Sequence, residues 1–258
     1  MSLPEKHRIR AAFSRAAVSY DAAAVLQREV CRQLLDMLRA SNAQHMPADI
    51  LDAGCGTGYG ARLLASEWPS ARLAAADFAA AMAQKTASTT AAACVADIES
   101  LPFRNQAFDL WWSSLTVQWC DPRYVFAEAV RVLRPQGRLA LSTLGPGTYA
   151  ELRQAFAGID HHRHTLDFSE PAPLAAAAET AGLAQLQIVR RTITLHYPDL
   201  KTLLGAVKAI GANALGDGRR SGMMGKAAWQ ALSAAYEAQR TADGLPASYD
   251  VILLTARA

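Results

Sequence analysis

A chain of 258 residues with 26 Lys and Arg against 23 Asp and Glu can bury a large core, but its charge is too balanced to indicate a nucleic-acid-binding protein. Cys31, Cys55, Cys94 and Cys120 form no C-x-x-C pair and are not grouped with histidines, which argues against zinc or disulfides and favours reduced thiols in a cytoplasmic protein. The first residues lack the apolar core of a signal peptide, and no apolar run is long enough to span a membrane, so we expect one domain without a membrane segment.

Helices are expected before the first strand. Residues 5–13 and 22–38 read as helical, and in the second segment the apolar residues recur at helical spacing with charged residues elsewhere. The connector between them carries an aromatic residue towards each end, Phe13 and Tyr20. Asp21 is expected to cap the second helix.

Strands and helices then alternate, which favours a parallel sheet covered on both faces. We expect strands at the apolar run that begins at Ile50 and at 72–76, 91–95, 108–113 and 138–142, with helices at 59–67, 79–86 and 124–133. Pro135-Gln136-Gly137 is expected to end the last of these helices.

The alternation weakens after Gly147. Helices are expected at 148–156 and 174–181, a polar loop rich in histidine lies between them, and residues 185–195 alternate as a strand does. Two consecutive helices, 200–210 and 223–240, interrupt the sheet pattern before a last strand at 249–255. We therefore expect a single domain, 1–258, in which N-terminal helices (1–40) and a helical lid insertion (196–242) accompany a cofactor-binding core (48–145).

The most informative stretch follows the first strand. After Asp52, glycines occupy alternate positions at Gly54, Gly56 and Gly58, and a helical segment follows. Glycine permits positive φ and close approach of a ligand to the backbone, and the N–H groups that open the helix then face that ligand. Residues 56–61 also fit the G-x-G-x-x-G/A fingerprint, so a dinucleotide oxidoreductase is an alternative.

Two further acids, Asp77 and Asp97, each end an apolar run. Asp52-x-Gly-x-Gly-x-Gly followed by such acids resembles the class I S-adenosylmethionine-dependent methyltransferases. The resemblance implies a Rossmann-like fold with a mostly parallel seven-stranded sheet, in which Asp77 binds the ribose hydroxyls and Asp97 lies by the adenine. The cofactor site it implies comprises Tyr20, Gln27, Asp52, Ala53, Gly54, Cys55, Gly56, Gly58, Asp77, Phe78, Met82, Asp97, Ile98 and Ser113, with no metal.

Gln118 and Trp119 lie just beyond the fourth strand, at the sheet edge where open α/β folds place ligands. Ser113-Ser114 stands where base and glutamine N-methyltransferases of this class carry an Asn/Asp-Pro-Pro-aromatic motif, which argues against nucleic acids and protein amides as substrates. Cys120 is not in the proline-cysteine context of cytosine C5 enzymes, which favours a small buried residue.

A closer resemblance spans nearly the whole chain. It rests on six segments in register: residues 13–28, the Asp97-Ile98-Glu99-Ser100-Leu101-Pro102 segment, Val117-Gln118-Trp119-Cys120, residues 142–148, Ile210-Gly211-Ala212-Asn213 and Gly244-Leu245-Pro246-x-x-Tyr249. Together these segments resemble the malonyl-acyl-carrier-protein O-methyltransferase (BioC) family, whose reaction begins biotin synthesis. A histidine often follows Gly-Ala-Asn in that family, but here the residue is Ala214, which leaves any role of that histidine open.

The reaction implied is methyl transfer from S-adenosylmethionine to the free carboxylate of a malonyl thioester. A carboxylate with a pKa of about 4 is already ionised at neutral pH, so no general base is needed, and the sequence offers no Ser/His/Asp constellation. Alignment and exclusion of water are then the contributions expected of the protein. The candidates for orienting the substrate are Tyr20, Gln118, Trp119 and the loop histidines His161, His162 and His164.

The family's substrate is carried by acyl carrier protein, a small acidic domain. Complementary charge is expected from Lys201, Lys208, Arg219, Arg220 and Lys226, although an ordinary solvated face is equally compatible with these residues. We expect a monomer. A small-acid O-methyltransferase of the aconitate type, which would act on free acids and ignore this basic patch, is the nearest alternative. A cofactor-binding regulatory or interaction protein without turnover is another, but the intact set of acids and glycines argues against it.

Overall fold

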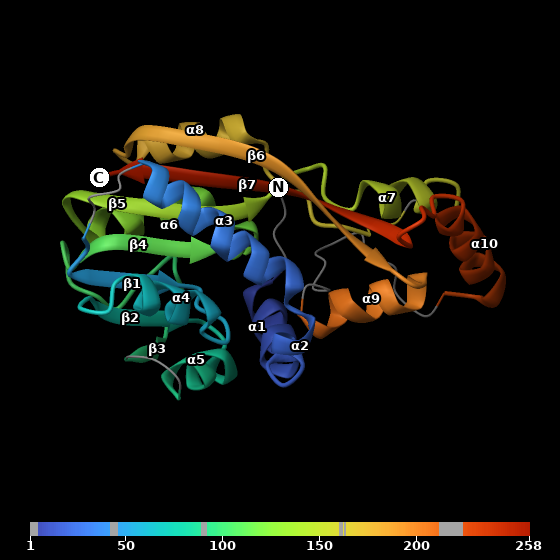
Figure 1. Ribbon diagram of the computed structural model, residues 1–258, viewed down its shortest axis with the longest axis horizontal. Helices are drawn as coiled ribbons and strands as arrows, with labels where there is room; N and C mark the ends of the chain where they lie inside the picture. Colours follow the sequence, from blue (N-terminus) through green and yellow to red (C-terminus); the bar gives the residue numbers. More distant parts are fainter. Residues whose placement is uncertain (1–4, 42–45, 89–91, 160–161, 163, 212–223) are drawn as a thin grey trace.

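The computed structural model describes residues 5–41, 46–88, 92–159, 162, 164–211 and 224–258. A seven-stranded sheet with strand order β3-β2-β1-β4-β5-β7-β6 runs through the molecule, and helices cover both of its faces (Figure 1). This is the mostly parallel sheet that the sequence predicted.

Neighbouring strands are parallel from β3 to β5, and β7 runs antiparallel to both β5 and β6. The strands are β1 (Asp49–Ala53), β2 (Arg72–Asp77), β3 (Ala93–Val95), β4 (Phe108–Ser114), β5 (Leu133–Leu144), β6 (Ala184–Tyr197) and β7 (Leu245–Arg257). The helices are α1 (Lys6–Ala16), α2 (Tyr20–Ala23), α3 (Val25–Ser41), α4 (Tyr59–Glu67), α5 (Ala80–Ala87), the 3₁₀ helix η1 (Val117–Trp119), α6 (Pro122–Val132), α7 (Ala150–Phe156), α8 (Pro171–Thr180), α9 (Leu200–Ala209) and α10 (Lys226–Glu237).

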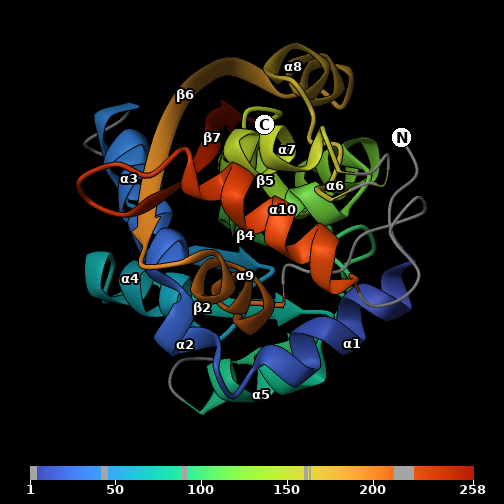
Figure 2. The same ribbon diagram turned by 90° about the vertical axis from the view of Figure 1, so that its right-hand side faces the viewer.

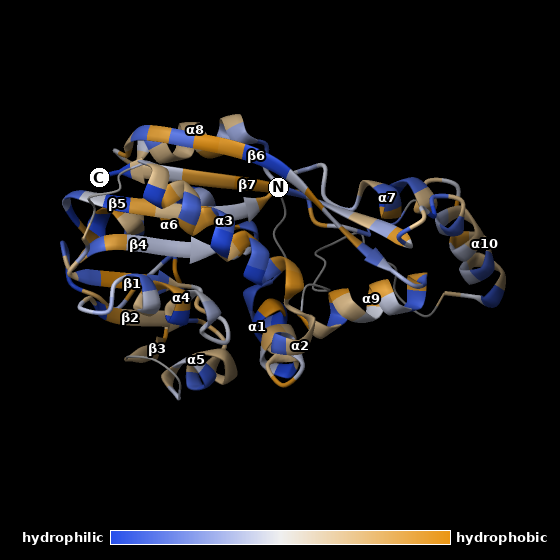
Figure 3. Ribbon diagram, viewed as in Figure 1, coloured by the Kyte–Doolittle hydropathy of each residue, from blue (hydrophilic) through white to orange (hydrophobic). Residues whose placement is uncertain are grey.

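The period of two along each strand divides the core into two parts. Trp112 packs with α3 and α4 on one face, and the adjacent Trp111 packs with α6 and α8 on the other, both fully buried. The same alternation separates Ile50 from Leu51. The colours of Figure 3 reflect this arrangement, since β7 is largely hydrophobic whereas the edge strand β6 alternates. Central strands covered on both faces need apolar residues at every position, which explains the runs seen in the sequence.

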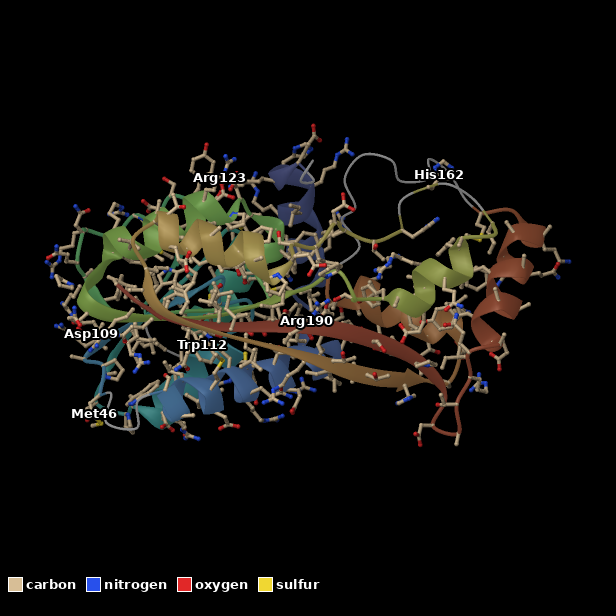
Figure 4. The ribbon with its side chains drawn as sticks, turned by 90° about the horizontal axis from the view of Figure 1, so that it is seen from above. Met46, Asp109, Trp112, Arg123, His162 and Arg190 are labelled. Atoms are coloured by element: carbon tan, nitrogen blue, oxygen red, sulfur yellow. The ribbon has the colours of Figure 1, made fainter. Side chains whose placement is uncertain are left out.

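The amino edge of the sheet is closed by charged side chains. Arg134 contacts Asp49 at 2.7 Å and Asp109 at 2.8 Å, and Arg72 also pairs with Asp49 at 2.6 Å. Figure 4 shows Asp109 at this end of the sheet and His162 beyond the opposite end. Because these ion pairs occupy the amino edge, we expect a ligand site at the carboxyl edge, where open α/β sheets usually bind ligands.

The boundary between α6 and β5 differs from the expectation. Asp121 caps α6 by accepting a hydrogen bond from the N–H of Arg123, and the helix ends at Val132, before Pro135. Leu133 is already extended and pairs with Phe108, so the strand begins five residues earlier than expected from its apolar run at Arg138. Pairing with β4 decides this boundary, and local sequence does not reveal it.

The expected cap at Asp21 is wrong. Asp21 lies inside α2, whose N-cap residue is Ser19, and α3 begins only at Val25. Its carboxylate instead accepts a hydrogen bond from Thr57 Oγ1 at 2.5 Å. Asp21 therefore ties the N-terminal helices to the glycine loop.

Both helices expected between the last two strands are present within the described residues, as α9 and α10, and their role as a lid stays a prediction. β6 and β7 extend beyond the other strands, and α7, α9 and α10 lie near their extended ends, past the carboxyl edge of the sheet (Figures 1 and 2). Tyr236 of α10 is fully buried, and its hydroxyl donates a hydrogen bond to the carbonyl of Pro246 at 2.8 Å.

Candidate functional site

The glycine loop lies at the point where the sheet order reverses between β1 and β4. The N–H groups of Gly54 and Cys55 both donate to the carbonyl of Ala76, at 2.7 and 3.0 Å. Asp77, at the end of β2, accepts hydrogen bonds from the N–H of Gly56 at 3.0 Å and of Ala79 at 2.8 Å. Open α/β sheets bind ligands at such a switch point.

Gly54 shows why this loop needs glycine. Its φ is +79°, and a Cβ built on it would lie only 2.3 Å from Oγ1 of Thr116. A side chain at this position would therefore separate the loop that follows β1 from the segment that follows β4.

A first cavity of about 610 Å³ opens beside this loop. It is walled by Gly54 and Gly56, by the segments that follow β2, β3 and β4, and by side chains of the N-terminal helices. The side chains that line it include Lys6, Phe13, Tyr20, Asp77, Asp97 and Trp119. An elongated ligand in this cavity would lie across the carboxyl ends of the strands.

A second cavity of about 760 Å³ shares Tyr20, Gly54 and Gly56 with the first and extends towards α3 and α4. Within it, Oδ2 of Asp52 and Oε1 of Gln27 are buried without a hydrogen-bond partner among the described residues. Buried acceptors of this kind are costly unless a donor meets them. They fit a ligand whose end carries N–H or ammonium donors.

The acids of the two cavities are held in low-dielectric surroundings. Burial raises the pKa of Asp52 to about 7, and the nearby charge of Asp77 adds to the shift. Burial also raises the pKa of Asp77 to about 6, although the N–H groups of Ala79 and Gly56 oppose the change. A cationic ligand would stabilise the ionised forms.

Helix α1 is tied to the rim of the first cavity. Nζ of Lys6 lies 2.5 Å from Asp97 Oδ2 and 2.6 Å from Glu99 Oε2. Burial lowers the pKa of Lys6, but its hydrogen bonds to these carboxylates outweigh that effect, so the pKa is raised overall. The ion pairs hold the start of α1 beside the expected adenine-binding acid.

A third, apolar cavity of about 1,120 Å³ continues from the first. Phe13, Tyr20, Leu115 and Trp119 line both. Its other walls come from α3, η1, α7, the 164–168 segment, α9 and the tyrosines Tyr149 and Tyr249. Within the part of the chain that the structure describes, its lining contains no Lys, Arg, Asp or Glu.

The partition between the first and the apolar cavity is fixed by backbone contacts. Leu115 has a φ of +52°, which is uncommon outside glycine. Its N–H donates to Ser142 Oγ at 3.1 Å, and its carbonyl accepts a hydrogen bond from Nε2 of Gln118 at 2.7 Å. Such conformations persist only where the surroundings hold them, and they are found frequently at functional sites.

Most of the predicted cofactor residues meet at these cavities. Gly54, Gly56 and Tyr20 line both the first and the second, Asp77, Phe78, Asp97 and Ile98 line the first, and Gln27, Asp52 and Cys55 line the second. Three other predicted cofactor residues do not line these two cavities but lie next to residues that do. Ala53 is buried at the end of β1, Gly58 precedes α4, and Met82 packs against Phe78 and Tyr20.

Ser113 is placed differently from the expectation. It is fully buried and lines neither cavity, whereas the next residue, Ser114, lines both. Successive side chains of a strand point to opposite faces of the sheet, so an error of one residue in the predicted position places the side chain on the wrong face. Ser114 therefore replaces Ser113 as the candidate.

The candidates for orienting a substrate are partly brought together. Tyr20, Gln118, Trp119 and His164 line the apolar cavity. The Gln118 amide is already engaged, since its Oε1 also accepts a hydrogen bond from Thr143 at 3.3 Å. His164 stacks on Phe156 with ring centroids 3.3 Å apart. His161 lies outside the described residues, and His162 is exposed.

The expected docking residues are only partly described. Lys201, Lys208 and Lys226 are exposed on α9 and α10, whereas Arg219 and Arg220 lie outside the described residues. Lys201 and Lys208 occupy one face of α9, as their spacing predicted.

Sequence reasoning missed several wall residues. Lys6 and Thr116 line the first cavity, but neither lies in a recognisable motif. Phe13 lies within the connector that carried the resemblance, and its ring meets that of Trp119 edge-on at 5.6 Å. The connector could have identified Phe13, whereas the Lys6 contact joins segments more than ninety residues apart.

No helix in the described portion of the chain is long and apolar enough to cross a membrane. Among the described residues, no three His, Cys, Asp or Glu side chains gather as ligands of a metal ion would.

The chain resembles known methyltransferases in sequence. The family of methyltransferase domains matches residues 51–141. Over 254 residues the chain is 49% identical to the malonyl-[acyl-carrier protein] O-methyltransferase of Dechloromonas aromatica, a match that covers 98% of this chain and 95% of that protein. The biotin biosynthesis bifunctional protein BioHC of Cellvibrio japonicus is 39% identical over 255 residues, which cover 97% of this chain and 50% of that protein.

Solved structures share the fold. The YcgJ protein of Bacillus subtilis has a TM-score of 0.60 at 17% identity, covering 88% of this chain and 98% of that one. Phosphoethanolamine N-methyltransferase 2 of Haemonchus contortus, in complex with S-adenosyl-L-methionine, has a TM-score of 0.57 at 16% identity. The match covers 95% of this chain and 57% of that one. At these identities the likeness establishes the fold alone.

Proposed function

The chain belongs to the malonyl-[acyl-carrier protein] O-methyltransferase family, and we propose that it transfers a methyl group from S-adenosylmethionine to the free carboxylate of malonyl-acyl carrier protein. The product is the malonyl methyl ester that starts biotin synthesis. One structural observation carries the proposal. The cavity at the glycine loop opens, past Phe13, Tyr20, Leu115 and Trp119, into a large apolar cavity whose described lining contains no Lys, Arg, Asp or Glu.

The residues of the first two cavities suit S-adenosylmethionine. Asp77 would offer a carboxylate to the ribose hydroxyls, and Asp97 and Ile98 would lie by the adenine. The buried acceptors of Asp52 and Gln27 suit the ammonium group of the methionine part, because they have no partner among the described residues. When bound, the cofactor supplies an electrophilic methyl group on a sulfonium.

The protein needs no general base for this acceptor. A carboxylate with a pKa of about 4 is ionised at neutral pH. The apolar walls exclude water and align the reactants, and well-oriented geometry is worth on the order of 7–11 kcal/mol. Attack neutralises a carboxylate and a sulfonium together, so an apolar environment suits the charge change.

Tyr20 is the best placed of the orienting candidates because it lines all three cavities. Burial raises the pKa of its hydroxyl, which therefore stays a neutral donor at neutral pH. A neutral donor orients a carboxylate without reducing its nucleophilicity as strongly as a cation would. Gln118, Trp119 and His164 complete the proposed acceptor site.

Carrier-protein contacts are proposed for the exposed Lys201, Lys208 and Lys226 of the lid helices. Arg219 and Arg220 belong to the same proposal, outside the described residues. On the inner side of α9, Leu204, Val207 and Ile210 line the apolar cavity. The lid would therefore bind the carrier protein on its outer side and cover the pantetheine arm of the substrate on its inner side. The expectations of a cytoplasmic monomer that uses no metal ion stay predictions.

The test uses purified protein, methyl-labelled S-adenosylmethionine and malonyl carrier protein, followed by intact-mass analysis. A gain of one methyl group on the malonyl carrier, absent with acetyl carrier protein, is the expected result. Cofactor binding without transfer to the carrier would contradict the proposed substrate. Transfer to free aconitate, with none to malonyl carrier protein, would identify an enzyme of the aconitate type.

A further inference from the structure

The outer face of α1 is strongly basic. The helix reads Lys6-His7-Arg8-Ile9-Arg10-Ala11-Ala12-Phe13-Ser14-Arg15-Ala16 and contains no acid. Its buried side is formed by Ile9, Ala12 and Ala16. Lys6 is paired with Asp97 and Glu99, which leaves Arg8, Arg10 and Arg15 as the cations of the exposed side. Cations in the first turn oppose the helix dipole, so helix stability alone does not account for this composition.

Arg8 and Arg15 lie seven residues apart and therefore share one face of the helix. Arg8 pairs with the exposed Glu5 at 3.0 Å, and Arg15 forms no ion pair with any residue that the structure describes. Val18 follows in the next turn and is 89% exposed. The exposed Val18 side chain, three residues after the unpaired Arg15, has no packing role within the described part of the chain.

This surface adjoins the end of α9. Ser19 Oγ donates a hydrogen bond to the carbonyl of Ala209 at 3.0 Å, which brings the turn after α1 beside the exposed Lys208. Gly211, with a φ of +73°, packs so closely on α1 that a Cβ would lie 3.2 Å from the ring of Phe13. Figure 2 shows α1, α2 and α9 together around this end of the molecule.

The same segments wall the proposed acceptor site. Phe13 and Tyr20 line the apolar cavity from the N-terminal helices, and Val207 and Ile210 line it from α9. A partner bound to the outer side of these segments would therefore lie over the contact between the N-terminal helices and α9, next to the apolar cavity.

We propose that Arg8, Arg15, Val18 and Lys208 form a docking surface, named here the α1 surface, for the acidic carrier protein. The inference rests on the proposed function and moves the centre of docking from the lid to the N-terminal helices. Carrier proteins are small acidic domains, and charge complementarity guides their approach and orientation. Val18 supplies the apolar contact that a purely charged surface lacks.

The location distinguishes the α1 surface from the rest of the lid. Lys208 is on the turn of α9 that meets α2, whereas Lys201 is about 10 Å away along the helix axis. A carrier centred on Val18 would lie nearer to Lys208 than to Lys201.

The experiment compares malonyl carrier protein with malonyl-pantetheine, a small thioester that needs no protein docking. The variants are Arg8→Glu/Arg15→Glu and, separately, Val18→Asp, all at exposed positions. The matched control is Arg104→Glu, an exposed cation in the turn before β4 at the opposite edge of the sheet. Melting temperatures verify that each variant is folded.

The expected result is a rise of roughly tenfold or more in KM for the malonyl carrier, with kcat/KM for malonyl-pantetheine within about twofold of the unmodified protein. Arg104→Glu should leave both substrates unchanged. Added salt should weaken carrier use by the unmodified protein more than by the double variant.

Equal losses on both substrates, or no loss on the carrier, would overturn the α1 surface. A selective loss in Lys201→Glu/Lys226→Glu without one in Arg8→Glu/Arg15→Glu would do the same and return docking to the outer lid. If the unmodified protein methylates neither malonyl substrate, it is the proposed function that fails.

Discussion

Nζ of Lys6 lies 2.5 Å from Oδ2 of Asp97, so the first turn of α1 is joined to the segment that follows β3. Both residues line the first cavity, and Phe13 and Tyr20 line the same cavity from α1 and α2. The N-terminal helices therefore form part of the proposed cofactor site, and a ligand that fills the cavity would lie beneath them.

Replacing Lys6 by Met should accelerate cofactor release. The change removes the ion pairs to Asp97 and Glu99 while keeping the aliphatic part of the side chain. Partly exposed pairs contribute up to about 1 kcal/mol each, so a threefold to tenfold faster dissociation of S-adenosylhomocysteine is expected in stopped-flow measurements. Arg10→Met, on the same helix but away from this contact, is the control. Equal dissociation rates in Lys6→Met and the unmodified protein would contradict the role given to this contact.

Asp77→Ala should weaken cofactor binding strongly. The carboxylate holds the N–H groups of Gly56 and Ala79 and is proposed to accept the ribose hydroxyls. Hydrogen bonds to a charged group are worth about 1.5–3 kcal/mol, so calorimetry should show a loss in affinity for S-adenosylhomocysteine of at least tenfold.

Asp77→Asn separates the two tasks of this residue, because an amide oxygen can still accept one backbone hydrogen bond while the charge is lost. We expect it to fold better than the alanine variant and still to bind the cofactor weakly. Unchanged affinity in Asp77→Ala would remove Asp77 from the ribose site.

The buried acids predict a pH dependence of stability. Burial raises the pKa of Asp52 to about 7 and that of Asp77 to about 6, above the ordinary value of 3.8. A group whose pKa is higher in the folded state stabilises the fold below its unfolded pKa, and this contribution is lost as pH rises through the folded pKa. The cofactor-free protein should therefore lose stability between about pH 4 and pH 7 through these two groups.

Thermal melts without cofactor, from pH 5 to pH 8, test this expectation. Asp52→Asn should flatten the profile because a neutral amide has no proton to lose. The extra stabilisation by S-adenosylhomocysteine should increase with pH, since its ammonium group favours the ionised acids. A cofactor-induced shift that is constant across this range would contradict the assignment of Asp52 to the ammonium group.

The glycines and acids of the site could be predicted because strand ends and loops are local features. Asp52, the glycines and Asp77 all lie directly after apolar runs, and a parallel sheet brings such ends to one edge. Ser113 and Ser114 differ in which face of β4 they occupy. The strand begins at Phe108 as predicted, but it ends at Ser114, one residue later than predicted.

Other features depend on contacts between distant segments. Asp21 looks like a helix cap in the sequence, yet its carboxylate bonds to Thr57, thirty-six residues away. β5 begins at Leu133 because that residue pairs with Phe108. The tie between Lys6 and Asp97 has no local signature, since a lysine at the start of a helix is ordinarily solvated.

The inner side of α9 gives a prediction about the acceptor cavity alone. Val207 lines the apolar cavity but not the cofactor cavities, so Val207→Trp should fill space that the acyl group needs. We expect kcat/KM to fall at least tenfold for both malonyl carrier protein and malonyl-pantetheine, while calorimetric affinity for S-adenosylhomocysteine stays within twofold. The matched control is Gly205→Trp, which adds similar bulk to the same helix at an exposed position where a Cβ meets nothing within 4 Å. Full activity in Val207→Trp would show that the substrate does not occupy this cavity, whereas equal loss in both variants would point to disruption of α9 itself.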